Sequence, residues 1–101
     1  MSWIRSFEGL IDFLSVVIVH APDDFFEEDF LSDDEQLTLE SSFEGIREGM
    51  TFVRRRIQDE AVIMQLENLL DDSLAAYRQG DDVRGAGLLQ RFEEVLIKKG
   101  T

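Results

Sequence analysis

The chain has 101 residues, enough for one domain, and its 22 acidic against 10 basic residues give a formal net charge of −12. So much negative charge disfavours direct binding to nucleic acid phosphates, because such binding needs Lys and Arg side chains. The absence of cysteine excludes a disulfide scaffold and a thiolate metal site, and it suits a reducing cytoplasm.

The first predicted element is an amphipathic helix over residues 2–19, with Ser2 as its cap. The apolar residues that recur there at helical spacing are Trp3, Ile4, Phe7, Leu10, Ile11, Leu14, Val17 and Ile18. A short strand at its β-branched end is the alternative. The apolar run in this segment is too short to cross a membrane. Glu8 and Asp12 fall within the region that would have to be apolar in a signal peptide, which argues against export. We therefore expect a cytoplasmic protein.

A strongly acidic segment follows. Residues 20–36 read HAPDDFFEEDFLSDDEQ, in which eight of seventeen residues are carboxylates and none is Lys or Arg. Pro22 ends the first helix, because proline removes a backbone donor and disfavours helical dihedrals at the residue before it. The segment lies within a 41-residue interval, between Arg5 and Arg47, that holds twelve acids and no base. The negative charge is therefore concentrated rather than spread along the chain.

We interpret this segment as a surface for a basic partner protein. Surrounding carboxylates steer a cationic partner, and buried aromatic side chains supply affinity. The predicted partner-binding residues are Asp23, Asp24, Phe25, Phe26, Glu27, Glu28, Asp29, Phe30, Asp33, Asp34 and Glu35. The alternative is that the three phenylalanines fold back and plug the helical core.

The second predicted helix covers residues 33–57, with Asp33 or Asp34 as its cap. Its apolar residues alternate at spacings of three and four, as in a heptad repeat: Leu39, Phe43, Ile46, Met50, Val53 and Ile57. Gly45 and Gly49 lie four residues apart on one face, where they would let another helix approach closely. This seam over residues 39–57 could pack within the chain or between two chains.

The third predicted helix covers residues 59–79. Its buried stripe is predicted to be Val62, Leu66, Leu69, Leu70, Leu74 and Tyr77. We predict a turn near Gln58 to Glu60, because an uninterrupted helix over 33–79 would be about 70 Å long. A chain of this length has an expected radius of gyration of only about 13 Å.

The fourth predicted helix covers residues 83–98, after a stop at Gly80 and a cap at Asp81 or Asp82. Its stripe is predicted to be Val83, Leu88, Leu89, Phe92, Val95 and Leu96. Lys98 and Lys99 complement the negative end of the helix dipole before Gly100. Together the four segments predict an all-α fold, a small antiparallel helical bundle of about four helices that forms a single domain over residues 1–101.

The chain shows no arrangement typical of catalysis. His20 is the only histidine and has no nucleophile motif near it, and an EF-hand register starting at Asp33 fails because Thr38 stands where glycine is required. We therefore expect no enzyme activity, no cofactor and no metal site, with weak Ca²⁺ or Mg²⁺ association at residues 23–35 left open. Arg54, Arg55 and Arg56 fan out around a helix and are predicted to balance acids on neighbouring helices.

In size, acidity and helix content the chain resembles the small cytoplasmic immunity proteins that bacteria make against their own toxins. The resemblance implies a binding protein that neutralises a basic partner, such as a nuclease-type toxin, by covering its positively charged active or binding surface. The alternatives are a helical adaptor or regulatory module and a homodimer built on the 39–57 seam. An inhibitor that mimics DNA would use the same electrostatics against a different target.

Overall fold

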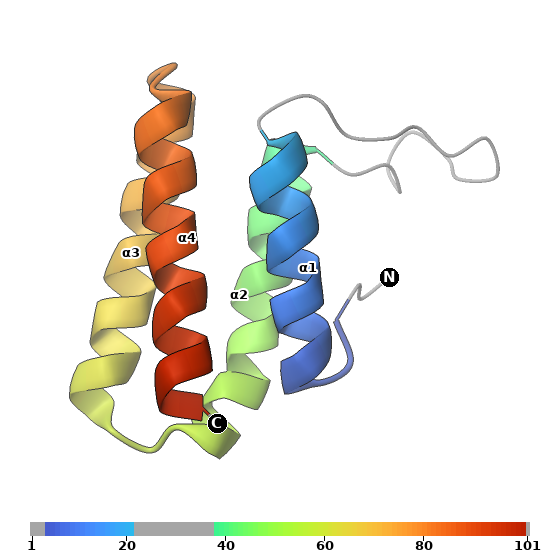
Figure 1. The fold of residues 1–101 in the computed structure, drawn as a ribbon, viewed down its shortest axis with the longest axis vertical. Helices are drawn as coiled ribbons and strands as arrows, with labels where there is room; N and C mark the ends of the chain where they lie inside the picture. Colours follow the sequence, from blue (N-terminus) through green and yellow to red (C-terminus); the bar gives the residue numbers. More distant parts are fainter. Residues whose placement is uncertain (1–3, 22–37, 101) are drawn as a thin grey trace, which may run out of the picture.

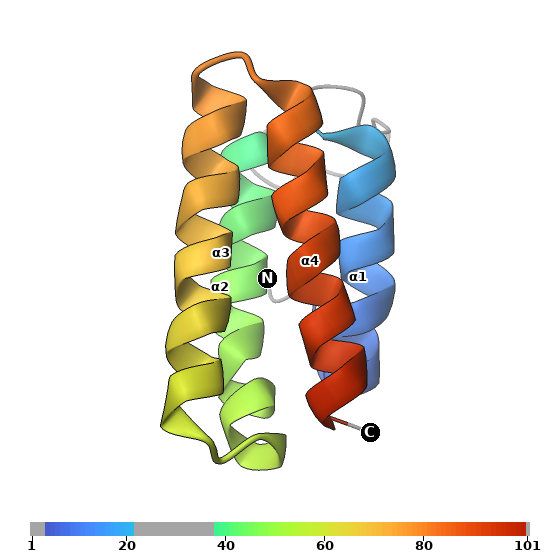
Figure 2. The ribbon, with the colours of Figure 1, turned by 60° about the vertical axis from the view of Figure 1, so that its left-hand side comes forward.

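Four helices make up nearly all of the chain that the structure, a computed structural model, describes, namely residues 4–21 and 38–100. They are α1 (Phe7–His20), α2 (Leu39–Arg56), α3 (Glu60–Arg78) and α4 (Asp82–Gly100). Consecutive helices run antiparallel, and α4 returns to lie beside α1 (Figures 1 and 2). The described residues contain no strand, and the radius of gyration is 13.2 Å, so the predicted small antiparallel helical bundle is confirmed.

The first two helices begin later than predicted, because residues nearer to the apolar stripe act as caps. The Ser6 side chain accepts a hydrogen bond from the Gly9 backbone N–H at 2.9 Å, and α1 begins at Phe7 rather than at residue 2. Thr38 and Ser41 form a capping box at the start of α2, so neither Asp33 nor Asp34 is its cap.

The turns between the later helices follow the prediction closely. Residues 57–59 separate α2 from α3, and the Asp59 side chain accepts a hydrogen bond from the Ala61 N–H at 3.0 Å. Gly80 has a φ of 83°, a conformation that suits glycine after a helix. Asp81 Oδ1 then accepts from the Arg84 N–H at 3.2 Å and helps to begin α4.

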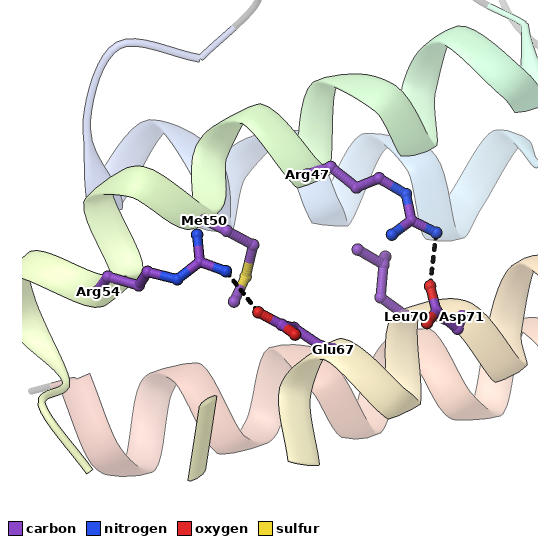
Figure 3. A pocket seen from close by; sticks show the side chains of 6 residues that line it. All are labelled: Arg47, Met50, Arg54, Glu67, Leu70 and Asp71. Atoms are coloured by element: carbon purple, nitrogen blue, oxygen red, sulfur yellow. Dashed lines mark hydrogen bonds and ion pairs between the residues drawn. The ribbon is translucent and has the colours of Figure 1, made fainter. Parts of the chain in front are cut away.

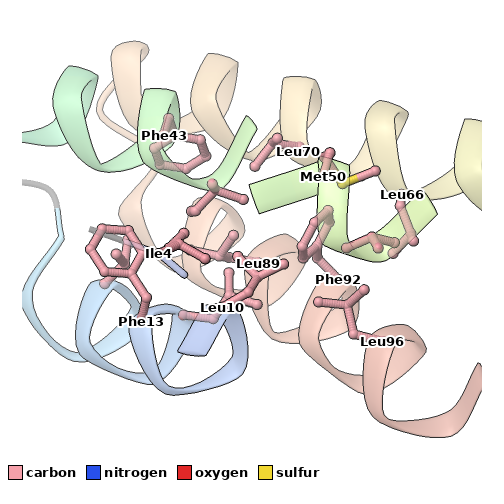
Figure 4. Close-up of a cluster of buried hydrophobic side chains, with 14 of the residues drawn as sticks. Ile4, Leu10, Phe13, Phe43, Met50, Leu66, Leu70, Leu89, Phe92 and Leu96 are labelled. Atoms are coloured by element: carbon pink, nitrogen blue, oxygen red, sulfur yellow. The ribbon is translucent and has the colours of Figure 1, made fainter. Parts of the chain in front are cut away.

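All four helices contribute to one apolar core (Figure 4). Its fully buried members with large side chains are Leu10, Leu14, Val17, Phe43, Ile46, Val53, Leu66, Leu70, Leu89, Phe92 and Leu96. Phe13 and Ile63 are also buried, although neither belongs to the predicted stripes. Val83 was predicted to be buried, and this is wrong: its side chain is 87% exposed, at the first turn of α4.

The seam over residues 39–57 packs inside the chain. Phe43, Ile46, Met50 and Val53 are buried against the other helices. A Cβ atom added at Gly49 would lie 3.0 Å from Leu10 Cδ1, so this glycine lets α1 approach α2 closely. At Gly49, the close approach that the sequence predicted therefore takes place within one chain, and a homodimer would need another surface.

Candidate functional site

The partner-binding residues predicted from the sequence lie outside the residues that the structure describes. They are Asp23, Asp24, Phe25, Phe26, Glu27, Glu28, Asp29, Phe30, Asp33, Asp34 and Glu35. The described residues on either side are the caps Ala21 and Thr38, which lie at the same end of the bundle (Figure 1). The acidic segment therefore begins and ends at one end of the molecule, and its role in binding stays a prediction.

Charge is divided unequally between this segment and the helices. Residues 4–21 and 38–100 hold all ten bases and fourteen of the 22 acids, which leaves a net charge of −4. Residues 22–37 hold the other eight acids and no base. Sixteen residues thus carry two thirds of the net charge of the whole chain.

Several bases of the bundle are already paired with acids of neighbouring helices. Three ion pairs join α2 to α3, and we call this contact the α2/α3 seam. Arg47 Nη2 lies 2.6 Å from Asp71 Oδ1, Arg54 pairs with Glu67, and Arg78 pairs with Glu40 through two bonds of 2.9 and 2.5 Å. The three residues of α2 that take part are seven positions apart, so they project from one face of that helix.

The ion pairs of the α2/α3 seam cover a cavity of about 250 Å³ (Figure 3). Met50 and Leu70 line it from opposite helices, between the pairs made by Arg47 and Arg54. All four side chains of those two pairs also line the cavity. The paired arginines therefore have their charge already matched, which leaves this cavity little capacity to attract an anion.

The pair between Glu40 and Arg78 shifts both ionisation equilibria. The hydrogen bonds from the Arg78 guanidinium lower the pKa of Glu40 below its usual 4.5, and the same bonds raise the pKa of Arg78. Both side chains are more than half exposed, so solvent weakens their attraction. The pair is therefore better suited to holding α2 in position against α3 than to acting as a catalytic acid or base.

Arg56 connects three helices at the end of the bundle opposite Ala21 and Thr38. Its guanidinium lies 3.1 Å from Glu8 Oε1, stands 4.6 Å from the centre of the Phe7 ring and donates to the Gly100 carbonyl at 3.5 Å. Together with the Arg54 pair, this confirms the predicted balancing of acids on neighbouring helices for two of the three consecutive arginines. The third, Arg55, instead stands over the ring of Phe52 on its own helix.

Tyr77 is the one side chain of the described residues whose buried polar atom has no hydrogen-bond partner. Its ring packs edge-on against Phe43, with the ring centres 5.9 Å apart, and closely against Gly85. Burial raises the pKa of the Tyr77 hydroxyl, and the negative charge of Asp82 adds to the rise. A neutral, enclosed phenol contributes to packing and offers no base or nucleophile.

A second cavity, of about 360 Å³, lies between α3 and α4, and we call it the α3/α4 groove. It is lined by Gln65 of α3 and, from α4, by Arg91, Glu94, Val95, Lys98 and Lys99. The sequence had suggested only a helix-dipole role for the two lysines. The spacing of Arg91 and Lys98, seven residues apart on one helix face, is the signal that could have indicated a shared site.

The part of the chain that the structure describes was searched for metal-binding groups and for helices that could span a membrane. No group of three or more His, Asp or Glu side chains is placed there to hold a metal ion. None of the four helices is both long and apolar enough to cross a membrane.

We compared the chain with protein-family models, with curated proteins and with solved structures, and none of them matched it.

Proposed function

We propose that this chain is a binding protein that neutralises a basic partner protein by covering a positively charged surface of that partner. The class of partner we propose is a toxin whose active site carries the basic residues needed to bind nucleic acid. The chain would then act as an immunity protein, and its carboxylates would stand in for phosphates of the natural substrate.

The division of charge is the observation that carries this proposal. In the bundle, Arg47, Arg54, Arg56 and Arg78 each have an acid of another helix within ion-pair distance. No base accompanies the eight acids of residues 22–37 in sequence. The bundle thus pairs many of its own charges, whereas the segment keeps a surplus that a cationic partner could match.

The ends of the segment support the same proposal. The Ala21 N–H donates to the Val17 carbonyl at 2.7 Å, and Thr38 is held by its capping box with Ser41. Both attachment points are therefore fixed to regular helices at one end of the bundle. The acidic residues 22–37 are thus joined to the bundle through Ala21 and Thr38 at this end.

Electrostatic steering supplies the proposed mechanism of rapid binding. Complementary charge can raise association to roughly 10⁸–10⁹ M⁻¹s⁻¹ at low salt, and salt screens the effect. Phe25, Phe26 and Phe30 would then provide the dry contact that slows dissociation.

The test begins with purification of the partner from the source cell and measurement of its association rate at about 50 and about 500 mM NaCl. We expect the rate to fall steeply at the higher salt concentration. An unchanged rate would contradict steering. A partner without a basic surface would contradict the proposal as a whole.

Two triple variants that each remove three negative charges test which surface of the chain contacts the partner. The first replaces acids of the segment: Glu27→Gln, Glu28→Gln and Asp29→Asn. The second replaces exposed acids of α3 and α4: Glu60→Gln, Asp72→Asn and Glu94→Gln. We expect the first to slow association about tenfold and the second much less. Equal slowing would show that only the total charge matters.

Single substitutions separate the contact role of the phenylalanines from the plug alternative. Phe26→Ala and Phe30→Ala are expected to weaken binding while leaving the unfolding free energy nearly unchanged. A loss of about 3–5 kcal/mol in stability, typical of a buried phenylalanine, would favour the plug.

A further inference from the structure

We propose that the α3/α4 groove binds a small anion that carries two adjacent phosphate groups. The proposed ligand is distinct from the basic protein partner above, and the two proposals can fail separately.

The groove has the volume of a small-molecule site and a lining that is mostly charged. Its volume of about 360 Å³ falls within the range of about 300–1,000 Å³ that is usual for such sites. Half-buried Val95 lies between Arg91 and Lys98 along α4 and gives the groove an apolar element. Arg91 and Lys98 begin about 10 Å apart along the helix axis, and both side chains reach the same groove.

The charges of the groove favour an anion with more than one negative charge. Three bases line it, whereas Glu94 is the only acid that does. In the described part of the chain, Arg91, Lys98 and Lys99 form no ion pair, unlike the arginines of the α2/α3 seam. The groove is thus a site of net positive charge on a chain whose net charge is −12.

The helix dipole accounts for only part of this arrangement. Lys98 and Lys99 lie in the last turn of α4, where cations are favourable on any exposed helix. Arg91 lies about two turns earlier than Lys98, beyond the reach of that effect, and Gln65 comes from a different helix. Exposed polar residues from two different helices therefore line the same cavity, and the dipole of α4 accounts only for the two lysines.

The types of side chain fit phosphate groups. An arginine guanidinium can donate two parallel hydrogen bonds to one phosphate, whereas a lysine ammonium acts as a mobile point charge for the next one. The Gln65 amide can donate a further bond. Since Glu94 offsets one of the three positive charges, a ligand with a single negative charge would gain much less than a diphosphate.

Inorganic pyrophosphate is the probe for this site. Isothermal titration at fixed ionic strength should show saturable binding of one pyrophosphate per chain and weaker binding of inorganic phosphate. In a parallel NMR titration, the backbone amide signals of Val95 and Lys98 should shift with the same midpoint. The absence of saturable binding up to about 10 mM pyrophosphate would overturn the proposal.

Matched double variants distinguish the groove from a general effect of charge. Arg91→Gln with Lys98→Gln should weaken pyrophosphate binding about tenfold or more. Arg5→Gln with Arg84→Gln removes two exposed bases outside the groove and should leave the affinity within about twofold. Equal weakening by both double variants would overturn the assignment to this groove. Circular dichroism on each variant checks that the helices remain folded.

Discussion

The two seams on either side of α3 join antiparallel helices in opposite ways. Toward α4, small residues let the helices approach closely: the ring of Tyr77 lies against Gly85, and the Ser73 hydroxyl donates to the Gly85 carbonyl at 2.7 Å. Toward α2, long charged side chains meet across a cavity, as in the pair of Arg47 with Asp71. Although charged side chains also line the α3/α4 groove, no ion pair among the described residues joins α3 to α4. The α3/α4 contact therefore depends on shape and burial, whereas the α2/α3 seam depends partly on charge.

This difference has a consequence for how the molecule responds to its surroundings. Burial of apolar area depends little on salt or pH, whereas exposed ion pairs are screened by salt and broken by protonation. We therefore expect α3 and α4 to behave as one rigid hairpin. The attachment of α2 to that hairpin should be the part of the bundle that conditions can alter.

The largest effect on stability should come from removing a large buried side chain from the core beside the α3/α4 hairpin. Phe92 of α4 is fully buried, and Phe92→Ala should lower the unfolding free energy by about 3–5 kcal/mol in urea denaturation. Val83→Ala on the same helix is the control, because Val83 is exposed and should change stability by less than about 0.5 kcal/mol. Similar losses from both variants would contradict the burial that the structure assigns to α4.

A second pair of substitutions measures how closely α3 and α4 approach. A Cβ atom at Gly85 would lie 2.7 Å from Tyr77 Cδ2, and that buried ring cannot move aside freely. Overpacking typically costs about 1–3 kcal/mol, and a gain in helix propensity of about 1 kcal/mol offsets part of it, so Gly85→Ala should destabilise the protein by up to about 2 kcal/mol. Gly87→Ala, two residues later, meets no atom within 4 Å and should instead stabilise the protein. Thermal unfolding of both variants checks the opposite signs.

The sequence predicted the helices well because their signal is local. Apolar spacing along each helix defines its buried face without reference to the other helices. The helix starts were harder, since Ser2, Ser6, Asp33 and Thr38 are all competent caps by residue type, and the structure uses Ser6 and Thr38. Val83 continues the apolar stripe of α4 in sequence, yet it lies in the first turn, where no other helix covers it.

The candidate sites were less predictable, because they depend on which helices become neighbours. The arginines of α2 were visible in the sequence, but the choice of Asp71 or Asp72 as a partner depends on the register between α2 and α3. The α3/α4 groove needs Gln65 and Arg91, which are 26 residues apart, to meet at one cavity. The partner-binding segment remains a prediction from charge and aromatic content alone.

The α2/α3 seam should show a smaller effect than the core, and one that depends on salt. Arg47→Gln with Arg54→Gln removes two exposed pairs, each worth about 0.2–1 kcal/mol. Arg5→Gln with Arg84→Gln changes the net charge equally without breaking an ion pair found in the structure. Urea denaturation should show a greater loss for the first variant at low salt, and the difference should shrink at about 1 M NaCl. A difference that persists at high salt would mean that packing, not charge, holds this seam.

The smallest expected effect concerns pH and the pair of Glu40 with Arg78. Because the guanidinium lowers the pKa of Glu40 in the folded protein, the folded state binds this proton less readily than the unfolded state does. The pair therefore stabilises the fold above the usual pKa of 4.5, and this contribution disappears as the pH falls through the lower pKa of the folded state. Glu40→Gln should be less stable than the unmodified protein at neutral pH, and the two stabilities should converge as the pH falls through the lowered pKa of Glu40 in the folded state. Glu44→Gln, one turn later on α2 and without an ion pair in the described residues, should show no such convergence. Convergence for both variants would indicate a response to total charge, and the α2/α3 seam would then lose its role as the pH-sensitive contact of the bundle.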